Sequence, residues 1–380
     1  MSRLRQEETD EYTFVFLNND GTRTSYSYGV PVKYADENGV MHDKNNTIKA
    51  FNSEYGNTAG DVELRFPQKL NKVRIGYKGH SIQINPVTEV SAGHISAVVS
   101  GNTVVYPGAF GQGIDLRYAS VMSGIKEDII LQSYSGKNSF SFEIKTGGLA
   151  LDEINGQYAI TDGEKIIFSF GDLEVLDSFN GENEAEDNWD EHRTTAQGEI
   201  VTLKENDRYI FTVTVAEDFL TSPSTVYPVY IDPSFNVTSQ YITDTYISEG
   251  APNTNYGTGA QMKIGYGSST QRNRILVQLS SMVNGTTRPG LNASSINNAT
   301  YHMYCTTTYT SQPYVDVYMI PLGADEWSDT TATWNNAYNN TSSTTYLQGS
   351  TIVGSSGWYN FNVTNAYKSW FGAFRSRGLM

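Results

Sequence analysis

Aromatic and cationic side chains occur close together in the last third of this 380-residue chain. The rings are those of Tyr256, Tyr266 and Trp327. The cations are those of Lys263, Arg272 and Arg274. A flat ring can stack on the apolar C–H face of a sugar, while Lys and Arg bond its hydroxyl rim or pair with the carboxylate of an acidic sugar. These six residues predict a glycan-binding surface in a partly pre-formed cleft.

Some residues of the same types are better suited to the protein core. Large aromatic side chains dominate core packing, so we expect Trp334 and Trp358 to be buried rather than to stack on a ligand. Arg274 precedes an alternating apolar run and is equally suited to tying a loop to a sheet. The stronger candidates for ligand contact are therefore Lys263, Tyr266 and Arg272.

No arrangement of residues is typical of a catalytic site. The five histidines include no pair with the H-x-x-x-H spacing of a metal site, and no G-x-S-x-G elbow precedes a helix. We therefore expect all five on the surface, with no shared role. Glu127 and Asp128 could imitate the acid and base of a glycosidase, but adjacent residues of a strand point to opposite faces. We interpret this pair as structural and predict that the chain is not an enzyme.

The single cysteine and the acidic residues give weak signals for other chemistry. Cys305 alone excludes an internal disulfide and a Cys-based zinc site. It lies in an alternating run in which Tyr301, Met303 and Cys305 share one face, so we expect a small buried side chain. Residues 182–191 are rich in acidic side chains but lack the spacing of a calcium loop, which predicts a solvated acidic loop.

The segments that must position these residues have the pattern of β-strands throughout the chain. Short runs of β-branched and aromatic residues alternate with polar turns. The clearest alternation puts four side chains on one face, namely Tyr209, Phe211, Val213 and Val215. No long segment has a helical apolar period, and the one short helix that we expect lies near residues 365–371. The sequence predicts an all-β fold and disfavours a nucleotide-binding α/β fold.

The formal net charge of −15 excludes some partners and marks a boundary. Nucleic-acid binding depends on dense Lys and Arg, and anionic membranes attract basic segments, so we expect neither partner. Residues 233–380 carry seven Lys and Arg against six Asp and Glu, whereas the preceding residues are strongly acidic. This change predicts a domain boundary near residue 233. There is no apolar run of about 18 residues, so we predict no membrane insertion.

Several motifs follow one another in the acidic part of the chain. They are Tyr28–Gly39 with Asn46–Ile48, then Gly113–Tyr118, Gly124–Leu131 and Val226–Pro233. In this order they resemble the N-terminal region of large wall-associated proteins of Firmicutes, many of which carry Rhs/YD repeats further on. The resemblance covers about residues 10–233. It implies a secreted or surface-displayed protein with further domains in the same polypeptide, and we expect that an export signal was lost by truncation.

A second ordered series of motifs begins at Asp244–Ile247. It continues with Pro252–Gly257, Ile264–Gly267, Asn273–Leu279, Glu326–Asn336 and Gly357–Thr364, and it includes Trp370. This series resembles a DNRLRE-type module, a jelly roll related to alginate-binding carbohydrate modules. The chain departs from the family pattern at Asn362, where the family usually has Asp, which puts a carboxylate role there in doubt.

The two resemblances together imply the domain organisation. We expect a β-sandwich-like N-terminal region over residues 1–232 and a β-jelly-roll module over residues 236–380. Because the family's module continues past Met380 into a closing strand, we expect the jelly roll to be truncated before that strand. Such modules often carry a structural Ca²⁺, for which Asp244 and Asp316 are the candidate ligands.

These observations predict a non-catalytic module that binds a polysaccharide or cell-wall glycan at the surface of a bacterium. An acidic glycan would suit the predicted cations. One alternative is a structural stalk for downstream Rhs/YD repeats and a toxin, with no ligand of its own. Another is an accessory part of a polysaccharide-degrading enzyme whose catalytic domain lies outside these residues.

Overall fold

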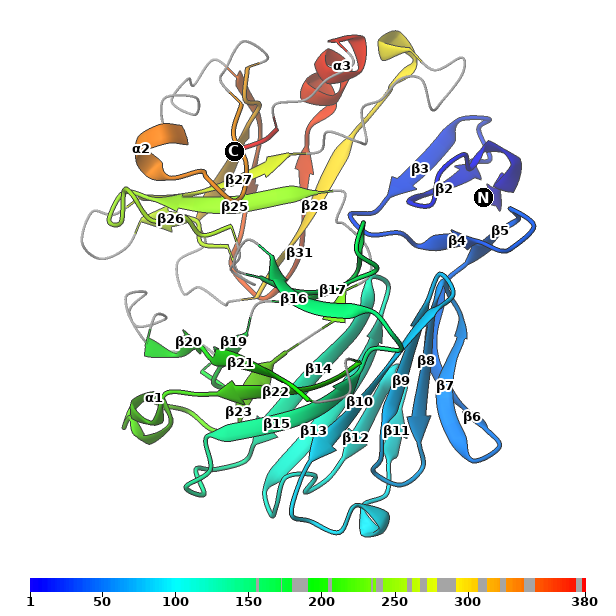
Figure 1. Cartoon of the computed structure of the whole chain (residues 1–380). Helices are drawn as coiled ribbons and strands as arrows, with labels where there is room; N and C mark the ends of the chain where they lie inside the picture. The colour runs from blue at the N-terminus through cyan, green and yellow to red at the C-terminus, as the bar shows by residue number, and fades with distance from the viewer. Residues whose placement is uncertain are drawn as a thin grey trace. The chain divides into compact units, whose positions relative to one another are not determined.

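The chain consists mainly of β-strands, which confirms the all-β prediction (Figure 1). The computed structural model describes residues 1–154, 157–171, 173–179, 191–203, 207–233, 235–236, 242–257, 262–266, 272–278, 292–306, 313–321, 326–337, 346–373 and 378–380. These residues form two compact units. The sandwich unit comprises Val30–Phe179 and Trp189–Ser239, and the C-terminal unit comprises Gln240–Met380 together with Met1–Gly29. Within the described residues, no helix has the length and apolar character needed to cross a membrane.

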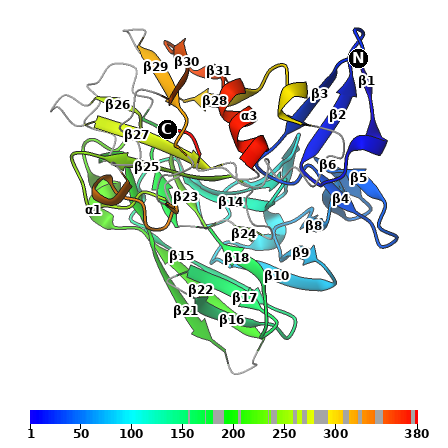
Figure 2. The same cartoon turned by 90° about the horizontal axis from the view of Figure 1, so that it is seen from above.

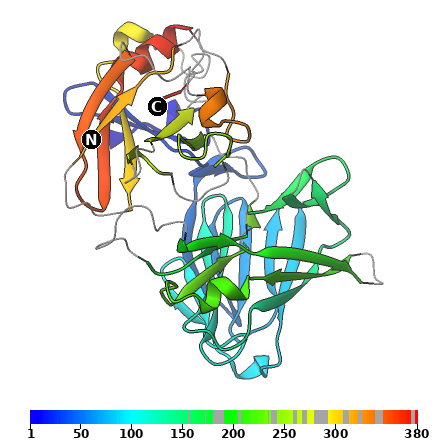
Figure 3. The same cartoon turned by 90° about the vertical axis from the view of Figure 1, so that its left-hand side faces the viewer.

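The sandwich unit contains two large antiparallel sheets (Figure 1, Figure 3). The eight-stranded sheet has the order β21 (Gln197–Thr202), β22 (Arg208–Thr214), β15 (Ser139–Lys145), β10 (His80–Val87), β9 (Val73–Tyr77), β8 (Val62–Pro67), β7 (Glu54–Ala59) and β6 (Asn45–Phe51). The eleven-stranded sheet follows β11 (Val98–Ser100), β12 (Thr103–Tyr106), β13 (Ile114–Val121), β14 (Gly124–Leu131), β24 (Phe235–Asn236), β18 (Ile166–Phe170), β17 (Gln157–Thr161) and β16 (Ala150–Ile154). Its branch contains β19 (Glu174–Leu176), β20 (Arg193–Thr195) and β23 (Val229–Asp232).

Smaller elements complete this unit. They are the hairpin of β4 (Lys33–Ala35) and β5 (Met41–Asp43), the 3-10 helix Ala92–His94 and the helix α1 (Glu217–Thr221).

One apolar core lies between the two sheets of the sandwich unit. Buried side chains from both sheets form a single cluster. For example, the ring of Phe66 on β8 lies 5.7 Å from that of Tyr118 on β13. The face predicted to be buried on and just after β22 belongs to this cluster, with Tyr209, Phe211, Val213 and Val215. Period-two alternation therefore identified this core face correctly.

The C-terminal unit is made of smaller sheets (Figure 2). The first sheet has the order β1 (Ser2–Arg3), β2 (Thr13–Leu17) and β3 (Arg23–Ser27), and the second has the order β25 (Thr243–Ser248), β27 (Arg272–Gln278) and β26 (Gly265–Tyr266). Two pairs follow, β28 (Thr300–Cys305) with β31 (Gly357–Asn362) and β29 (Tyr314–Tyr318) with β30 (Leu347–Ile352). The helices are α2 (Trp334–Ala337), α3 (Thr364–Ala373) and the 3-10 turns Arg5–Glu7 and Ala293–Ser295. The helix α3 confirms the short helix expected near residues 365–371.

Both faces of the β25–β27–β26 sheet are covered. Tyr246 of β25 packs in one buried cluster with Phe361 and Trp370, whereas its neighbour Ile247 packs in another cluster with Trp334. Since adjacent residues of a strand point to opposite faces, this sheet lies between two layers of apolar side chains.

Residues 378–380 link two of these strands. The backbone of Leu379 exchanges hydrogen bonds of 2.7 and 2.9 Å with Val277 at the end of β27. The backbone of Met380 exchanges two hydrogen bonds of 2.9 Å with Tyr318 of β29. This short segment therefore joins the edges of β27 and β29 through main-chain hydrogen bonds.

Candidate functional site

The two arginines of the predicted basic surface lie over one buried ring. Both guanidinium groups cover Trp334, at 5.2 Å for Arg272 and 5.5 Å for Arg274. Trp334 is only 7% exposed, as predicted for a core residue. Arg272 also donates two hydrogen bonds of 2.8 Å to the carboxylate of Glu249, which lowers the pKa of Glu249 to about 2. A carboxylate of the same unit therefore already neutralises Arg272.

The other predicted binding residues have several different environments. Tyr256 stacks on Tyr246 with ring centroids 4.2 Å apart, and it is partly buried against the apolar cluster. Trp327 is partly buried against the apolar cluster that contains Trp334. Lys263 is half-buried in the segment that leads into β26. The backbone of Tyr266 pairs with Arg272, while its side chain lies outside the described part of the structure.

The predicted calcium ligands lie on different strands. Asp244 is half-buried on β25, where burial and the nearby Asp329 raise its pKa. Asp316 is exposed on β29 and accepts hydrogen bonds from Ser350 and Tyr318. Where the structure describes the chain, no group of three or more His, Cys, Asp or Glu side chains is arranged to hold a metal ion. The acidic run 182–191, apart from its last residue, lies outside the described residues.

The side chain of Asn362 makes a hydrogen bond that an amide oxygen and a carboxylate oxygen accept equally well. Its side-chain oxygen accepts a hydrogen bond of 3.0 Å from the backbone N–H of Thr364 at the start of α3. Helix starts leave backbone N–H groups without intrahelical partners, and either Asn or Asp supplies the missing acceptor. The departure from the family's Asp therefore keeps this contact.

The prediction that Trp358 is buried is wrong. Trp358 is 70% exposed on β31, and Tyr304 beside it on β28 is 52% exposed. The register pairs these two residues directly, and the alternating positions Tyr359 and Phe361 face the apolar cluster instead. A sequence signal for this orientation existed, because Trp358 shares its strand face with Asn360.

The alternation predicted for residues 301–305 is confirmed, because His302 and Tyr304 are exposed whereas Tyr301, Met303 and Cys305 are partly covered. Cys305 is half-buried, so the expectation that it is buried is wrong.

We call the four residues His302, Tyr304, Trp358 and Asn360 the Trp358 face. The rings of Tyr304 and Trp358 are 5.4 Å apart and meet edge to face at 72°. Two residues along each strand, His302 Nδ1 lies 2.6 Å from the side-chain oxygen of Asn360. The face thus combines an exposed aromatic pair with a hydrogen-bonding pair of an imidazole and an amide.

The turn before Trp358 is held by hydrogen bonds to one hydroxyl group. The hydroxyl oxygen of Tyr359 accepts hydrogen bonds from the backbone N–H groups of Gly354 and Ser355, at 3.2 and 3.0 Å. The hydroxyl of Tyr304 lies 3.2 Å from that of Ser356 in the same turn. These contacts hold the turn at residues 354–356 beside the aromatic pair, at one end of the paired strands β28 and β31.

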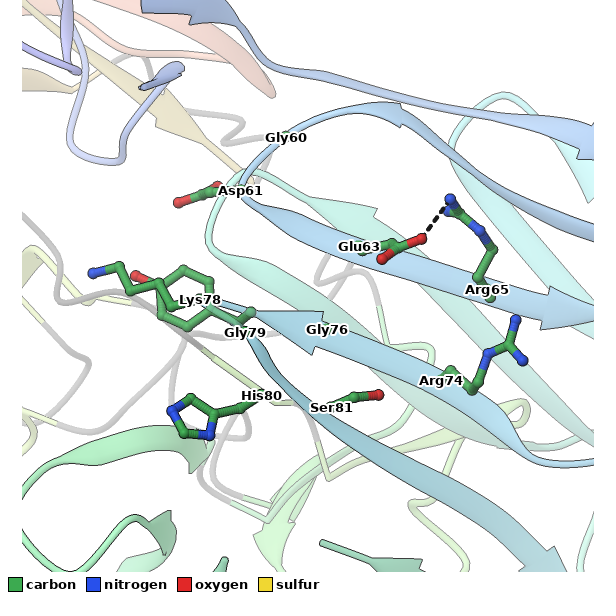
Figure 4. Close-up of a pocket in the computed structure, with 11 residues that line it drawn as sticks. Gly60, Asp61, Glu63, Arg65, Arg74, Gly76, Lys78, Gly79, His80 and Ser81 are labelled. Carbon is green, nitrogen blue, oxygen red and sulfur yellow. Dashed lines mark ion pairs between the residues drawn. The ribbon is translucent and has the colours of Figure 1, made fainter. Parts of the chain in front are cut away.

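The sandwich unit has a charged hollow on its eight-stranded sheet (Figure 4). It has a volume of about 550 Å³ and lies over the ends of β8, β9 and β10. Figure 4 shows Glu63 and Arg65 reaching toward one another from β8, at 2.6 Å, with Arg74 on the neighbouring strand. Arg74 pairs with Glu54 at 2.6 Å. The arginines of the hollow are therefore bound to carboxylates of their own sheet.

Three residues of this hollow have the side-chain types of a hydrolase triad, but they do not form one. They are Asp61, His80 and Ser81. Asp61 pairs with Lys44 at 2.5 Å, and His80 and Ser81 are adjacent on β10, so their side chains diverge. Within the described residues, no hydrogen bond connects any two of the three. A nucleophile requires such a bond to its base.

The carboxylates of Glu127 and Asp128 lie on opposite sides of β14, in agreement with the structural interpretation. Asp128 bonds Arg117 at 2.8 Å and lies 3.5 Å from Lys126. Glu127 is 1% exposed opposite Tyr118, and burial raises its pKa well above the usual value. Asp128 is 2% exposed, so both carboxylates are buried.

One histidine differs from its predicted surface position. His192 is buried, and its Nδ1 lies 2.7 Å from the carboxylate of Asp177. Its ring stacks on Phe179 with centroids 3.8 Å apart. The three residues pack together just after β19 and just before β20, which gives this histidine a structural position.

Comparison with known proteins identifies one part of the chain by family. Residues 236–375 match carbohydrate-binding module family 96. The chain is 28% identical over 289 residues to the tRNA nuclease WapA of Bacillus subtilis strain 168, a match that covers 71% of this chain and 11% of that protein. It is 27% identical over 216 residues to a wall-associated protein of Geobacillus stearothermophilus, covering 52% of this chain and 79% of that protein.

The chain thus spans 11% of the length of the Bacillus relative. No solved structure gives a significant match. The chain therefore contains a segment that matches a carbohydrate-binding module, and it is homologous to WapA of Bacillus and to a wall-associated protein of Geobacillus.

Proposed function

We propose that residues 236–375 bind polysaccharide without catalysing a reaction, in a protein that acts at the cell surface or outside the cell. The observation that carries this proposal is the exposed aromatic pair of Tyr304 and Trp358 on a segment that matches a carbohydrate-binding module. Flat exposed rings beside hydrogen-bonding side chains suit the apolar faces and hydroxyl rims of sugars. The wall-associated relative supports the location.

The absence of catalysis is supported by the arrangement of the described polar groups. The candidate acid–base pair Glu127 and Asp128 points to two sides of a strand, and the Asp61, His80 and Ser81 side chains are not linked. The Bacillus relative is named as a tRNA nuclease, but this chain matches only 11% of it. The net charge of −15 also opposes binding of a phosphate backbone.

A structural role is the second candidate. The similarity to the Bacillus relative extends over 289 residues and so continues well beyond residues 236–375. On this alternative both units form a scaffold within a longer wall-associated protein, such as one with Rhs/YD repeats, and bind no glycan.

Affinity gels with the full chain distinguish these functions. The gels contain a soluble β-glucan, a galactomannan or polygalacturonate, each with added Ca²⁺ or with a chelator. We expect retardation in at least one polysaccharide relative to a gel without sugar. If the chain migrates normally in every gel, polysaccharide binding is rejected and the scaffold is favoured. If a chelator abolishes binding, a structural Ca²⁺ at Asp244 or Asp316 gains support.

A further inference from the structure

We infer that the β1–β2–β3 sheet carries a second surface for the polysaccharide, on which the apolar faces of sugar rings stack. Its four aromatic side chains, Phe14, Phe16, Tyr26 and Tyr28, are called the N-terminal aromatic face. The inference rests on the proposed function and adds to it a contact surface outside residues 236–375, the segment that matches a carbohydrate-binding module.

Strand pairing brings the four rings together on one side of this sheet. The three strands lie side by side (Figure 2), and the register places Phe14 of β2 opposite Tyr26 of β3. The rings form two edge-to-face pairs, Phe14 with Tyr28 at 5.6 Å and Phe16 with Tyr26 at 5.8 Å. Residues two apart on a strand point to the same side, so the four rings form one continuous row.

The two tyrosines of this row are exposed, whereas the opposite side of the sheet is covered. Tyr26 and Tyr28 are 44% and 41% exposed. On the opposite side, Thr13 and Val15 are only 3% and 4% exposed. The sheet therefore packs through the side of Val15, and this packing does not require the tyrosine rings. Neighbouring exposed rings of this kind are typical of an interaction surface.

The groups that the face presents are those that a sugar ring can contact. Where the structure describes the chain, neither tyrosine hydroxyl has a hydrogen-bond partner, and a phenol hydroxyl can both donate and accept. Further along the same side of β3, Thr24 accepts a hydrogen bond of 2.9 Å from the side chain of Asn18. Flat rings suit the apolar C–H face of a pyranose, and hydroxyl and amide groups suit its hydroxyl rim. Neutral and acidic pyranoses share that apolar face, so the inference holds for either.

The face is formed before any ligand arrives. Five consecutive residue pairs join β2 to β3. The guanidinium of Arg3 on β1 lies 4.3 Å from the centre of the Phe14 ring. It is held there by hydrogen bonds of 2.7 and 2.8 Å to the carboxylate of Glu8, which also accepts a bond from the backbone N–H of Val15. A ligand that meets rings already in position loses less entropy on binding.

A polysaccharide is the occupant that the surrounding unit favours. Residues Met1–Gly29 belong to the same compact unit as Gln240–Met380, which contains most of the matched module. A polymer bound by the module is therefore present at a high effective concentration near the other surfaces of that unit. A second contact with the same polymer then raises the total affinity even when each contact is weak. The other occupant of an exposed edge such as β3 is a second copy of the chain, and the experiment includes a measurement of oligomeric state.

The experiment uses the full chain with both exposed tyrosines replaced. Tyr26→Ala combined with Tyr28→Ala removes the rings, whereas Tyr26→Phe combined with Tyr28→Phe keeps the rings and removes only the hydroxyls. Each double variant is compared with the wild type by affinity gel and calorimetry, using whichever of the β-glucan, the galactomannan and polygalacturonate binds the wild type. Circular dichroism and the melting temperature check the fold, and sedimentation velocity without sugar gives the oligomeric state.

We expect the alanine double variant to bind the polysaccharide roughly fivefold more weakly or worse, because both exposed rings are lost. The phenylalanine double variant should stay within about twofold of the wild type, since the rings supply most of the contact. Nitration by tetranitromethane, followed by mass spectrometry of peptides, provides a readout on the unaltered chain. The bound polysaccharide should protect Tyr26 and Tyr28, relative to a polysaccharide that does not retard the chain.

Two results would overturn the inference and leave the proposed function of residues 236–375 intact. One is polysaccharide binding by the wild type that leaves the nitration of both tyrosines unchanged or that the folded alanine double variant retains in full. The other is a wild-type dimer that the alanine double variant dissociates, which would make the face an interface between copies. If the alanine double variant does not fold, the nitration result decides. Failure of the wild type to bind any of the three polysaccharides rejects the proposed function and the inference together.

Discussion

Replacing the buried Glu127 by Gln should remove a pH dependence from the stability of the sandwich unit. Glu127 is 1% exposed on β14, and its pKa is raised well above 4.5, first by burial and then by the charges of Asp232 and Asp128. A raised pKa means that folding favours the protonated carboxyl. Gln has nearly the same shape and has no proton to lose in this range.

The sign and size of the effect follow from proton linkage. Below pH 4.5 the carboxyl is protonated in both the folded and the unfolded chain, so its full contribution to stability is present. Above pH 4.5 the unfolded chain releases the proton while the folded chain retains it. The free energy of unfolding therefore falls by about 1.4 kcal/mol per pH unit, until the pH reaches the folded-state pKa.

Urea unfolding is measured at several pH values between 4.5 and about 8. Hydrogen exchange of the backbone amides in β13 and β14 monitors the unfolding, so that the sandwich unit is observed separately from the C-terminal unit. Glu127→Gln should become more stable relative to wild type at each step in pH. Tyr118→Phe is the control, because it alters the neighbouring buried hydroxyl but keeps the carboxyl and the slope. A difference between wild type and Glu127→Gln that stays constant with pH would refute the argument.

Two further predictions concern the C-terminal unit. Glu249→Gln removes the negative partner of Arg272, so we expect new, salt-sensitive binding to polygalacturonate in affinity gels. If the variant binds polygalacturonate no better than the wild type does, Arg272 is inaccessible to a glycan carboxylate. Trp334→Ala should lower the free energy of unfolding of this unit by about 3–5 kcal/mol in urea denaturation, because the ring is 7% exposed beneath two guanidinium groups. A loss as small as that for an exposed aromatic residue would contradict the core position of Trp334.

Much of the fold could be predicted from local patterns. Strand alternation identified the buried face of Tyr209, Phe211 and Val213, and it separated Glu127 from Asp128. It also placed Tyr304 on the opposite face from Met303. The strand period is a property of the backbone itself, so these predictions needed no knowledge of distant segments.

The candidate site was less predictable, because it depends on which face of each strand is covered. Trp358 was assigned to the core by its size, yet the other face of β31 carries Phe361 and packs inward. His192 was expected at the surface, yet it packs on Phe179 beside Asp177. In both cases the residues that cover one face of the strand or pack on the side chain come from other segments of the chain, Tyr246 for the Phe361 face of β31 and Phe179 for His192.

The sequence alone determined the all-β class, the alternation within each strand and the uneven distribution of charge. Only the tertiary structure decided which rings remain exposed and which cations are already paired. Tyr304 meets Trp358, and Arg272 meets Glu249, through strand pairing and loop packing between segments that are distant in sequence. The register of such pairings depends on the packing of the whole unit, whereas alternation depends only on the geometry of one strand.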